Sequence, residues 1–529
     1  MKSGSNQGTL NRRKFLGTAS VAATALVSRT ATAADVKTAS SGPVAETKAG
    51  KVRGAVINKV NAFKGISYGA STAGANRFMP PQKPAPWTGI KDALDWGPEA
   101  PQGPHTEIPE VLATVPKGTI SEDCLHLNVW TNGLKGKRPV MVWFHGGGFT
   151  SGNGSYTIYD GANLARKHDV VTVTINNRLN SFGFVYAPEA GASNAGMLDC
   201  VAALEWVRDN IANFGGDPKN VTIFGQSGGG GKVSTLLAMP AAKGLYHRAI
   251  IQSGANLRGV ARDAAATTTQ SLMAAVKVKT FAELQKVPMD QLVTATLNTR
   301  GLNFSPVSDG KSLPGDPFNP AAPDLAADVP VLIGTTQFEV NFFPNTNLNP
   351  IDDAALHAAF KQATRATDAD VDKLIAVYRK GRPQATNVDL QQIVASDNFR
   401  TQVITETELK AAQKAPVYSY YFTWPSPVHE GKLKAFHTLE IPFVFGNVDE
   451  GKTMTGTGSD RYPLQEKMSA AWAAFARTGN PNHKELPTWP AFKTDTRPTM
   501  IFDNECKVVN DPHGEERLAL AGTRPAPRA

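Results

Sequence analysis

Short apolar runs rich in β-branched and aromatic residues alternate along the chain with segments of helical periodicity. The apolar runs occupy residues 140–144, 170–175, 221–224 and 249–251. Between the second and third runs, apolar residues recur at helical spacing at Leu204, Val207, Ile211 and Phe214. Continuous apolar strands are typical of a sheet buried on both faces. Their alternation with helices predicts an α/β fold with a large, mostly parallel central sheet flanked by helices.

The second half of the chain has a more helical pattern. Residues 262–297 and 352–415 are rich in Ala, Leu, Lys, Gln and Asp, which predicts helical insertions over the C-terminal edge of the sheet. A later helix, ended by Gly479-Asn480-Pro481, carries on one face Leu464, Met468, Trp472 and Phe475. Neither a tandem repeat nor a long linker divides the chain, so we expect one large domain over residues 34–529.

The N-terminal 33 residues have the composition of an export signal. The segment Asn11-Arg12-Arg13-Lys14-Phe15-Leu16 is a twin-arginine pattern, and a mild apolar stretch over 17–27 and the small residues Ala31-Thr32-Ala33 follow it. The apolar stretch is too short for stable membrane insertion, which takes about 20 apolar residues. We therefore expect a twin-arginine signal peptide over residues 1–33 and a periplasmic or secreted protein.

The remaining composition excludes several classes of protein. The 529 residues carry 55 basic and 46 acidic side chains, or +9, but five basic residues and no acidic one lie in the signal. The rest therefore carries 50 against 46, or +4, which gives no reason to expect a nucleic-acid partner. The three cysteines, Cys124, Cys200 and Cys506, form neither a disulfide framework nor a zinc motif. No metal or other cofactor is expected.

The most specific chemical motif is Gly225-Gln226-Ser227-Gly228-Gly229. It follows the apolar run at 221–224, and a helical segment up to Met239 comes after it. A strand, a tight turn and a helix in this order hold a serine hydroxyl out at the top of a sheet, as serine hydrolases require. A phosphate-binding loop is the rival interpretation, because Gly231-Lys232 resembles its end. It fails because Gln226 stands where the loop begins with glycine and Val233 where it needs Ser or Thr.

A second glycine-rich segment could supply donors for an oxyanion. His145-Gly146-Gly147-Gly148-Phe149 comes directly after the apolar run at 140–144. Glycine N–H groups can approach a substrate closely, so we predict an oxyanion hole made by Gly147, Gly148 and Gly228. A flexible loop is the alternative. The fold also requires a base and an orienting carboxylate after the serine, and the residues alone do not select one histidine from the downstream histidines.

The chain resembles the type B carboxylesterases, the carboxylesterase and cholinesterase family of α/β-hydrolases. The likeness extends over almost the whole chain after the signal. Besides the two glycine motifs, it rests on Phe63-Lys64-Gly65-Ile66, Glu122-Asp123-Cys124-Leu125, Leu127-Asn128-Val129-Trp130, Asn177-Arg178-Leu179, Phe214-Gly215-Gly216-Asp217-Pro218, Gln252-Ser253-Gly254 and Trp489-Pro490. The resemblance implies a carboxylic ester hydrolase with an acyl-enzyme intermediate, and a catalytic domain over 34–529.

Carried over to this sequence, the resemblance implies Ser227 as nucleophile, Glu339 as orienting acid and His437 as base. Asp309 is the rival acid, with a turn-forming role as its alternative. The other downstream histidines, His247, His357, His429, His483 and His513, lie in less suitable surroundings. Glu440 should lie near His437 on the wrong side for its orienting nitrogen. We expect Cys124 to be unpaired, because Ala100 stands where the family often has its partner, and Gln226 and Gly228 replace a common glutamate and alanine.

The substrate is expected to be a small-molecule ester. Candidate pocket residues, chosen because they lie near the catalytic segments in sequence, are Phe149, Phe342, Phe343 and Trp424. Amide or carbamate hydrolysis would use the same triad. A non-catalytic, esterase-like binding or adhesion module is the alternative from another class, although such proteins usually lack the serine or its base.

Overall fold

The computed structural model describes residues 41–105, 107–116 and 118–523, so the predicted signal peptide lies outside the described residues. A central sheet of eleven strands runs through the molecule in the order β14-β13-β12-β11-β10-β9-β7-β8-β6-β4-β3. The strands from β8 to β13 in this order pair in parallel, and antiparallel pairs flank them at both edges. A separate small sheet has the order β1-β2-β5. The mostly parallel sheet predicted from the sequence is confirmed.

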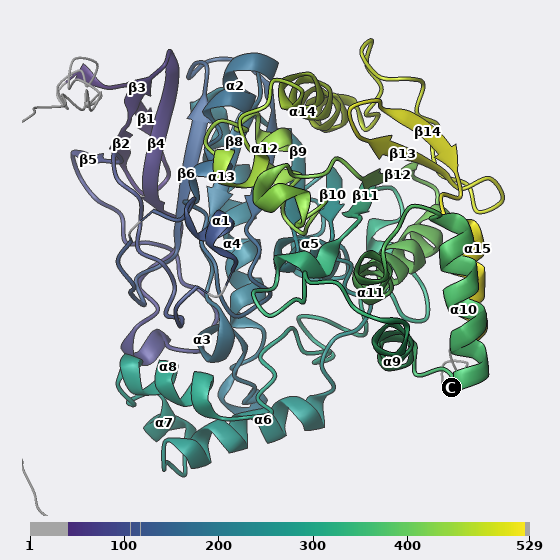
Figure 1. Cartoon of the computed structure of the whole chain (residues 1–529). Coiled ribbons are helices and arrows are strands. Elements are labelled where there is room, and N and C mark those ends of the chain that lie inside the picture. Colours follow the sequence, from purple (N-terminus) through teal and green to yellow (C-terminus); the bar gives the residue numbers. More distant parts are fainter. Residues whose placement is uncertain (1–40, 106, 117, 524–529) are drawn as a thin grey trace, which may run out of the picture.

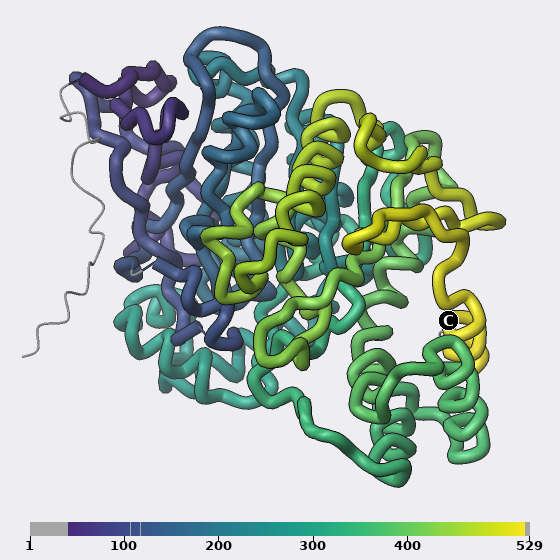
Figure 2. The backbone as a smooth tube through the Cα atoms, turned by 45° about the horizontal axis from the view of Figure 1, so that its top comes forward, coloured from purple at the N-terminus to yellow at the C-terminus, as the bar shows by residue number. Residues whose placement is uncertain are grey.

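Figure 1 shows this sheet spanning the molecule from the purple strands of the N-terminal part to the yellow β13 and β14. Figure 2 shows the same two parts of the chain on opposite sides. The strand bounds are β1 Val44–Glu46, β2 Lys51–Arg53, β3 Ala55–Ile57, β4 Val60–Ser67, β5 Ile90–Asp92, β6 His126–Thr131, β7 Arg138–Phe144, β8 Val171–Ile175, β9 Gly216–Gln226, β10 Arg248–Gln252, β11 Val331–Thr336, β12 Val417–Phe422, β13 Pro498–Phe502 and β14 Lys507–Asn510.

The central strands bury side chains on both faces, which explains their continuous apolar sequence. On β7, Val140 and Val142 belong to one core cluster, while Met141 and Trp143 belong to the other. Successive side chains of a strand point to opposite faces, so each strand contributes to both cores. Helices α4 and α5 cover the first face, and α14 covers the second.

The helices form a layer on each face and two insertions. Their bounds are α1 Pro109–Leu112, α2 Ala162–His168, α3 Asn180–Phe184, α4 Ala195–Asn210, α5 Gly228–Leu237, α6 Arg262–Ala275, α7 Phe281–Leu284, α8 Met289–Asn298, α9 Asp353–Thr364, α10 Asp368–Gly381, α11 Asn387–Ala411, α12 Ile441–Phe445, α13 Lys452–Thr455, α14 Arg461–Thr478 and α15 Gly514–Thr523. The predicted helix carrying Met468 and Trp472 is α14, and Gly479 ends it in a left-handed conformation at φ 82°.

The two predicted helical insertions are also present. Helices α6 to α8 follow β10, and α9 to α11 lie between β11 and β12, below the sheet in the view of Figure 1. Parts of the second insertion form their own apolar cluster, which includes Leu356, Phe360 and Leu374. Within the described part of the chain, no helix combines the length and the apolar character needed to cross a bilayer.

Candidate active site

Ser227 lies in a sharp turn between β9 and α5. Its backbone has φ 57° and ψ −125°, a conformation that a residue with a side chain adopts only when its surroundings impose it. The surrounding backbone supplies two hydrogen bonds, one from Ser227 N–H to the Gln252 carbonyl at 2.8 Å and one from Gly231 N–H to the Ser227 carbonyl at 2.9 Å. The predicted strand, turn and helix are therefore all present.

The glycines after Ser227 are required by close backbone approach. A Cβ atom on Gly228 would lie 1.9 Å from the carbonyl oxygen of Gly148, and one on Gly229 would lie 1.9 Å from that of Phe144. Glycine in a helix costs about 1 kcal/mol relative to alanine, so contact with the neighbouring segments explains why the sequence retains it. The start of α5 is thereby packed directly onto the end of β7 and the loop that follows.

Glu339 and His437 come together from two loops that follow parallel strands. Glu339 begins a short helical turn just after β11, and its buried carboxylate accepts a hydrogen bond from Thr336 N–H at 2.9 Å. The second carboxylate oxygen pairs with Nδ1 of His437, which is also buried. The two loops are tied together by the Phe338 N–H, which donates to the Ala435 carbonyl at 2.9 Å. The structure thus pairs the predicted acid with the predicted base.

Ser227 and His437 line the same cavity, of about 220 Å³. His437 Nε2 lies 3.1 Å from the side-chain nitrogen of Gln226. Because Nδ1 faces a carboxylate, the neutral ring carries its proton there and Nε2 accepts the Gln226 hydrogen bond. Of the two ring nitrogens, Nε2 is therefore the one that Glu339 does not engage.

The two predicted oxyanion glycines after β7 line this cavity as well. Gly147 and Gly148 both have a positive φ, 87° and 63°, and Gly228 begins α5 beside Ser227. The first N–H groups of a helix have no partner within the helix. The three predicted donors therefore belong to two segments that meet at the serine.

Comparison with known proteins relates almost the whole chain to one family of enzymes. The sequence profile of the Carboxylesterase family matches residues 41–520. The chain belongs to this family. It is 37% identical to para-nitrobenzyl esterase of Bacillus subtilis strain 168, with 90% of this chain and 98% of the relative aligned. It is 31% identical to phenmedipham hydrolase of Pseudarthrobacter oxydans, with 89% and 97% aligned.

Solved structures support the same conclusion. A thermophilic PNB esterase superposes with a TM-score of 0.79 at 36% identity, covering 90% of this chain and all of its own. The protein is therefore a carboxylesterase of the α/β-hydrolase fold and a carboxylic ester hydrolase.

Ser227 also lines a second cavity of this carboxylesterase, of about 200 Å³. Phe342 and Phe343 line the first cavity and Phe149 lines the second. Trp424 lines neither of them. Its buried indole packs against Phe443 and donates to Asp460 and Asn504. Nearness in sequence to the catalytic segments therefore does not bring Trp424 to either of these two cavities.

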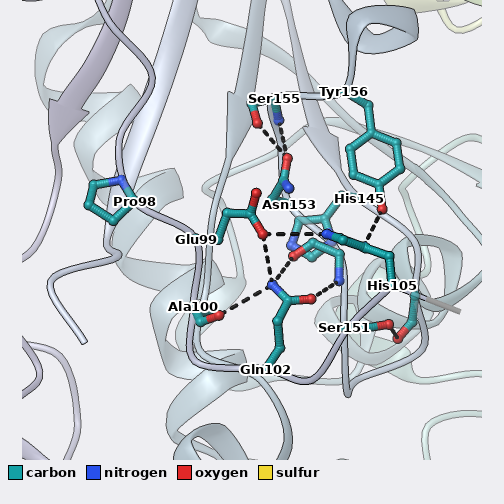
Figure 3. A network of polar contacts seen from close by, with 12 residues as sticks. Pro98, Glu99, Ala100, Gln102, His105, His145, Ser151, Asn153, Ser155 and Tyr156 are labelled. Atoms are coloured by element: carbon teal, nitrogen blue, oxygen red, sulfur yellow. Dashed lines mark hydrogen bonds and ion pairs between the residues drawn. The ribbon is translucent and has the colours of Figure 1, made fainter. Parts of the chain in front are cut away.

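A polar network at the rim of the esterase's first cavity was not predicted from the sequence. Figure 3 shows His105 between Glu99 and the hydroxyl of Tyr156, and Gln102 against the loop that follows the oxyanion glycines. Gln102 accepts from Gly152 N–H at 2.7 Å and donates to its carbonyl at 3.1 Å. Hydrogen bonds with Glu107 and Glu99 raise the pKa of His105 to about 9, so this rim holds a cation between two acids.

Two further buried ionisable groups lie close to the site. Burial and the charge of Glu339 raise the pKa of Glu440 to about 7, and Glu440 accepts from Gln252 at 3.3 Å rather than facing Nδ1 of His437. Lys232 on α5 is fully buried, and burial lowers its pKa to about 8. No role for Lys232 was predicted from the sequence once the phosphate-loop interpretation had failed.

The rival acid Asp309 lines neither cavity of the site. Asp309 accepts hydrogen bonds from Ser193 and Ser312 at 2.7 Å each, as a turn-forming residue does. Cys124, Cys200 and Cys506 are free, as expected.

Proposed function

We propose that this carboxylesterase cleaves esters through an acyl-enzyme formed on Ser227. His437 Nε2 takes the hydroxyl proton as Ser227 Oγ attacks the ester carbonyl carbon, and Glu339 fixes the tautomer and stabilises the imidazolium. When the intermediate collapses, the bond to the alcohol oxygen breaks and His437 gives that oxygen the proton. Water, activated by the same ring, then releases the acid and restores Ser227.

The observation that carries this proposal is the pairing of His437 Nδ1 with Glu339 Oε2 at the cavity that Ser227 lines. A carboxylate at Nδ1 leaves Nε2 as the only ring nitrogen able to accept a proton. The N–H groups of Gly147, Gly148 and Gly228 are proposed as the oxyanion donors. Removing one such donor typically costs about 100–1000-fold in turnover.

The two cavities beside Ser227 suit the two halves of an ester. Phe342 and Phe343 would contact one half and Phe149 the other, because apolar walls with few polar groups are typical of ligand pockets. The name of the Bacillus relative suggests para-nitrobenzyl esters as first substrates. The esterase is therefore proposed to act on small, uncharged esters with an aryl or benzyl group.

Covalent labelling by an organophosphate tests the proposal. The intact protein should take up one phosphoryl group per chain, seen by intact mass, and lose turnover of p-nitrophenyl acetate. Ser227→Ala should take up no phosphoryl group and should not hydrolyse p-nitrophenyl acetate. Ser253→Ala is a matched control, since Ser253 is also buried and lines the second cavity, and it should still be labelled.

The alternative functions would give different results. Faster turnover of aryl carbamates or anilides than of matched esters would favour the amide or carbamate hydrolase. A folded protein that neither labels nor hydrolyses any of these substrates would instead be an esterase-like binding module.

We also infer that residues 1–33 are a twin-arginine export signal and that residues 34–529 form the mature catalytic domain. The support is the Arg12-Arg13 pair, the apolar stretch and the small-residue cleavage site. In a Gram-negative host with the twin-arginine pathway, the mature enzyme should accumulate in the periplasm, and Arg12→Lys with Arg13→Lys should retain the precursor in the cytoplasm.

A further inference from the structure

Lys232 is a buried cation packed against the oxyanion loop at residues 145–148. It lies on α5, five residues after Ser227, and its side chain has no exposed surface. Its Nζ donates to the carbonyl oxygen of His145 at 3.1 Å and to that of Gly148 at 3.2 Å. Within residues 41–105, 107–116 and 118–523, no carboxylate pairs with this ammonium group.

A buried lysine without an acidic partner is costly to the fold. Desolvation disfavours the charged form, as the lowered pKa of Lys232 shows. An uncharged side chain of the same length, such as methionine, would fill this space and continue the helix without that cost. Stability therefore does not explain a lysine at position 232. Its hydrogen bonds to the His145 and Gly148 carbonyl groups offer another explanation.

The two carbonyl groups that Lys232 holds bracket the predicted oxyanion donors. The His145 carbonyl belongs to the peptide unit before the one that carries Gly147 N–H. The Gly148 carbonyl belongs to the peptide unit after the one that carries Gly148 N–H. Holding both outer units restricts the orientations of the two between them, because only the φ and ψ angles of Gly146, Gly147 and Gly148 join these planar units. Gln102 holds the same loop farther on, at Gly152.

We propose that Lys232 is a positioning residue for the oxyanion hole, which orients the N–H groups of Gly147 and Gly148 by holding the loop carbonyls of His145 and Gly148. The inference rests on the proposed function, since it assumes that these N–H groups stabilise the reacting oxygen. Lys232 does not touch the substrate in this role. Its effect is the orientation of the loop before the reaction begins.

Gly228 and Lys232 both lie next to the carbonyl oxygen of Gly148. The Gly148 oxygen that Lys232 holds is the atom that a Cβ on Gly228 would approach to 1.9 Å. Lys232 draws this carbonyl toward α5, and the missing Cβ at position 228 leaves room for it. The two residues therefore act on one atom, and substitutions at the two positions should not be independent.

Lys232→Met tests the positioning role, with Lys410→Met as its matched control. Lys410 is a second buried lysine that donates to a backbone carbonyl, that of Ala326 at 2.7 Å, but it lies on α11 away from the loop. With active sites counted by organophosphate titration, Lys232→Met should lower kcat by about 10–100-fold. KM should stay within about threefold, since a transition-state interaction is lost. Lys410→Met should keep the wild-type kcat.

A boronic acid inhibitor gives a second readout that a merely structural role would not move. Its tetrahedral adduct places an oxygen in the oxyanion hole, so its affinity should fall by about the same factor as kcat in Lys232→Met. If Lys232→Met does not fold, Lys232→Gln is measured in the same way, since it also removes the charge and keeps a donor too short to reach both carbonyls.

A double-mutant cycle tests the coupling to Gly228. Gly228→Ala alone should lower kcat by at least about tenfold, because the held carbonyl cannot move away from the new Cβ. In the Lys232→Met background the same change should cost less than about threefold, because the loop is free to shift. In the Lys410→Met background it should cost as much as in the wild type.

The outcomes separate this inference from the proposed function. The role of Lys232 would be overturned if Lys232→Met had the same kcat and boronate affinity as Lys410→Met. It would also be overturned if the effects of the two substitutions in the double-mutant cycle simply multiplied. In both cases an inactive Ser227→Ala would leave the proposed function standing. If Ser227→Ala kept full turnover, the proposed function itself would fail, whatever the lysine variants did.

Discussion

The side-chain amide of Gln226 and the ring of His437 meet Nε2 to Nε2 at a distance of 3.1 Å. Gln226 is fully buried, and its side-chain oxygen has no hydrogen-bond partner among the described residues. The nitrogen proposed as the general base thus accepts a hydrogen bond from the residue directly before the nucleophile. The resemblance described above implies a glutamate as the common residue here, where this chain has a neutral donor.

Gln226→Glu should move the acid limb of the kcat/KM profile to higher pH by about one unit. A carboxylate beside His437 Nε2 would favour the protonated ring, which cannot accept the Ser227 proton. Initial rates with a p-nitrophenyl ester between pH 5 and 9 measure the shift. Gln226→Met keeps the length and removes the donor without adding a charge, so its acid limb should rise by less than that of Gln226→Glu. Superimposable profiles of the wild type and Gln226→Glu would contradict the contact.

Glu339→Gln should lower kcat by about 10³–10⁴-fold with little change in thermal stability. The amide can keep the hydrogen bond from Thr336 N–H, but its nitrogen would face His437 Nδ1 and impose the wrong tautomer. Steady-state kinetics on titrated enzyme and a thermal melt give the two quantities.

Asp309→Asn is the matched substitution for Glu339→Gln, because Asp309 was the rival acid. Asp309 accepts from several side chains and backbone N–H groups of its own turn, so the variant should lose stability while each folded molecule keeps most of its turnover. A result in which Asp309→Asn is inactive and Glu339→Gln active would reverse the assignment.

The two cavities predict separable changes in specificity. Phe343 lines the first cavity and is 45% exposed, so Phe343→Ala should enlarge it at little cost to the fold. Ala255 lines the second, and Ala255→Phe should fill it. In ester series that vary the acyl or the alcohol group alone, each variant should change kcat/KM by about tenfold or more in one series and not in the other. Parallel changes in the same series would show that both cavities hold the same half of the ester.

Local patterns of the sequence account for the strands, the serine turn and the helices. The alternation of Val140, Met141, Val142 and Trp143 between the two cores follows from the period of a strand, and Gly228 is explained by its neighbours. Contacts between residues far apart in the chain leave no local pattern in the sequence from which they could be predicted. His437 could be chosen only by resemblance, and the contact of Lys232 with Gly148 spans 84 residues. The position of Trp424 outside both cavities has the same cause, since its partners Phe443 and Asp460 lie farther along the chain.

Glu406 should make the stability of the enzyme depend on pH. Burial raises its pKa to about 8, and its carboxylate accepts only from Ser234 Oγ, at 2.9 and 3.0 Å, among the side-chain donors of the described residues. The unfolded chain releases this proton near pH 4.5 and the folded protein releases it near pH 8. Between these values the folded state binds more protons, so stability falls as the pH rises and the full cost is present above pH 8.

Glu406→Gln should remove this dependence. Compared with the wild type, the variant should gain on the order of a few kcal/mol in the free energy of unfolding at pH 9 and much less at pH 5. Urea denaturation at both pH values measures the difference, and Glu505→Gln, at an exposed position, should show none. Because Glu406 packs against α5 rather than lining either cavity, kcat should be unchanged in the same variant. An equal gain at pH 5 and pH 9 would mean that the carboxylate of Glu406 is not desolvated in the folded enzyme.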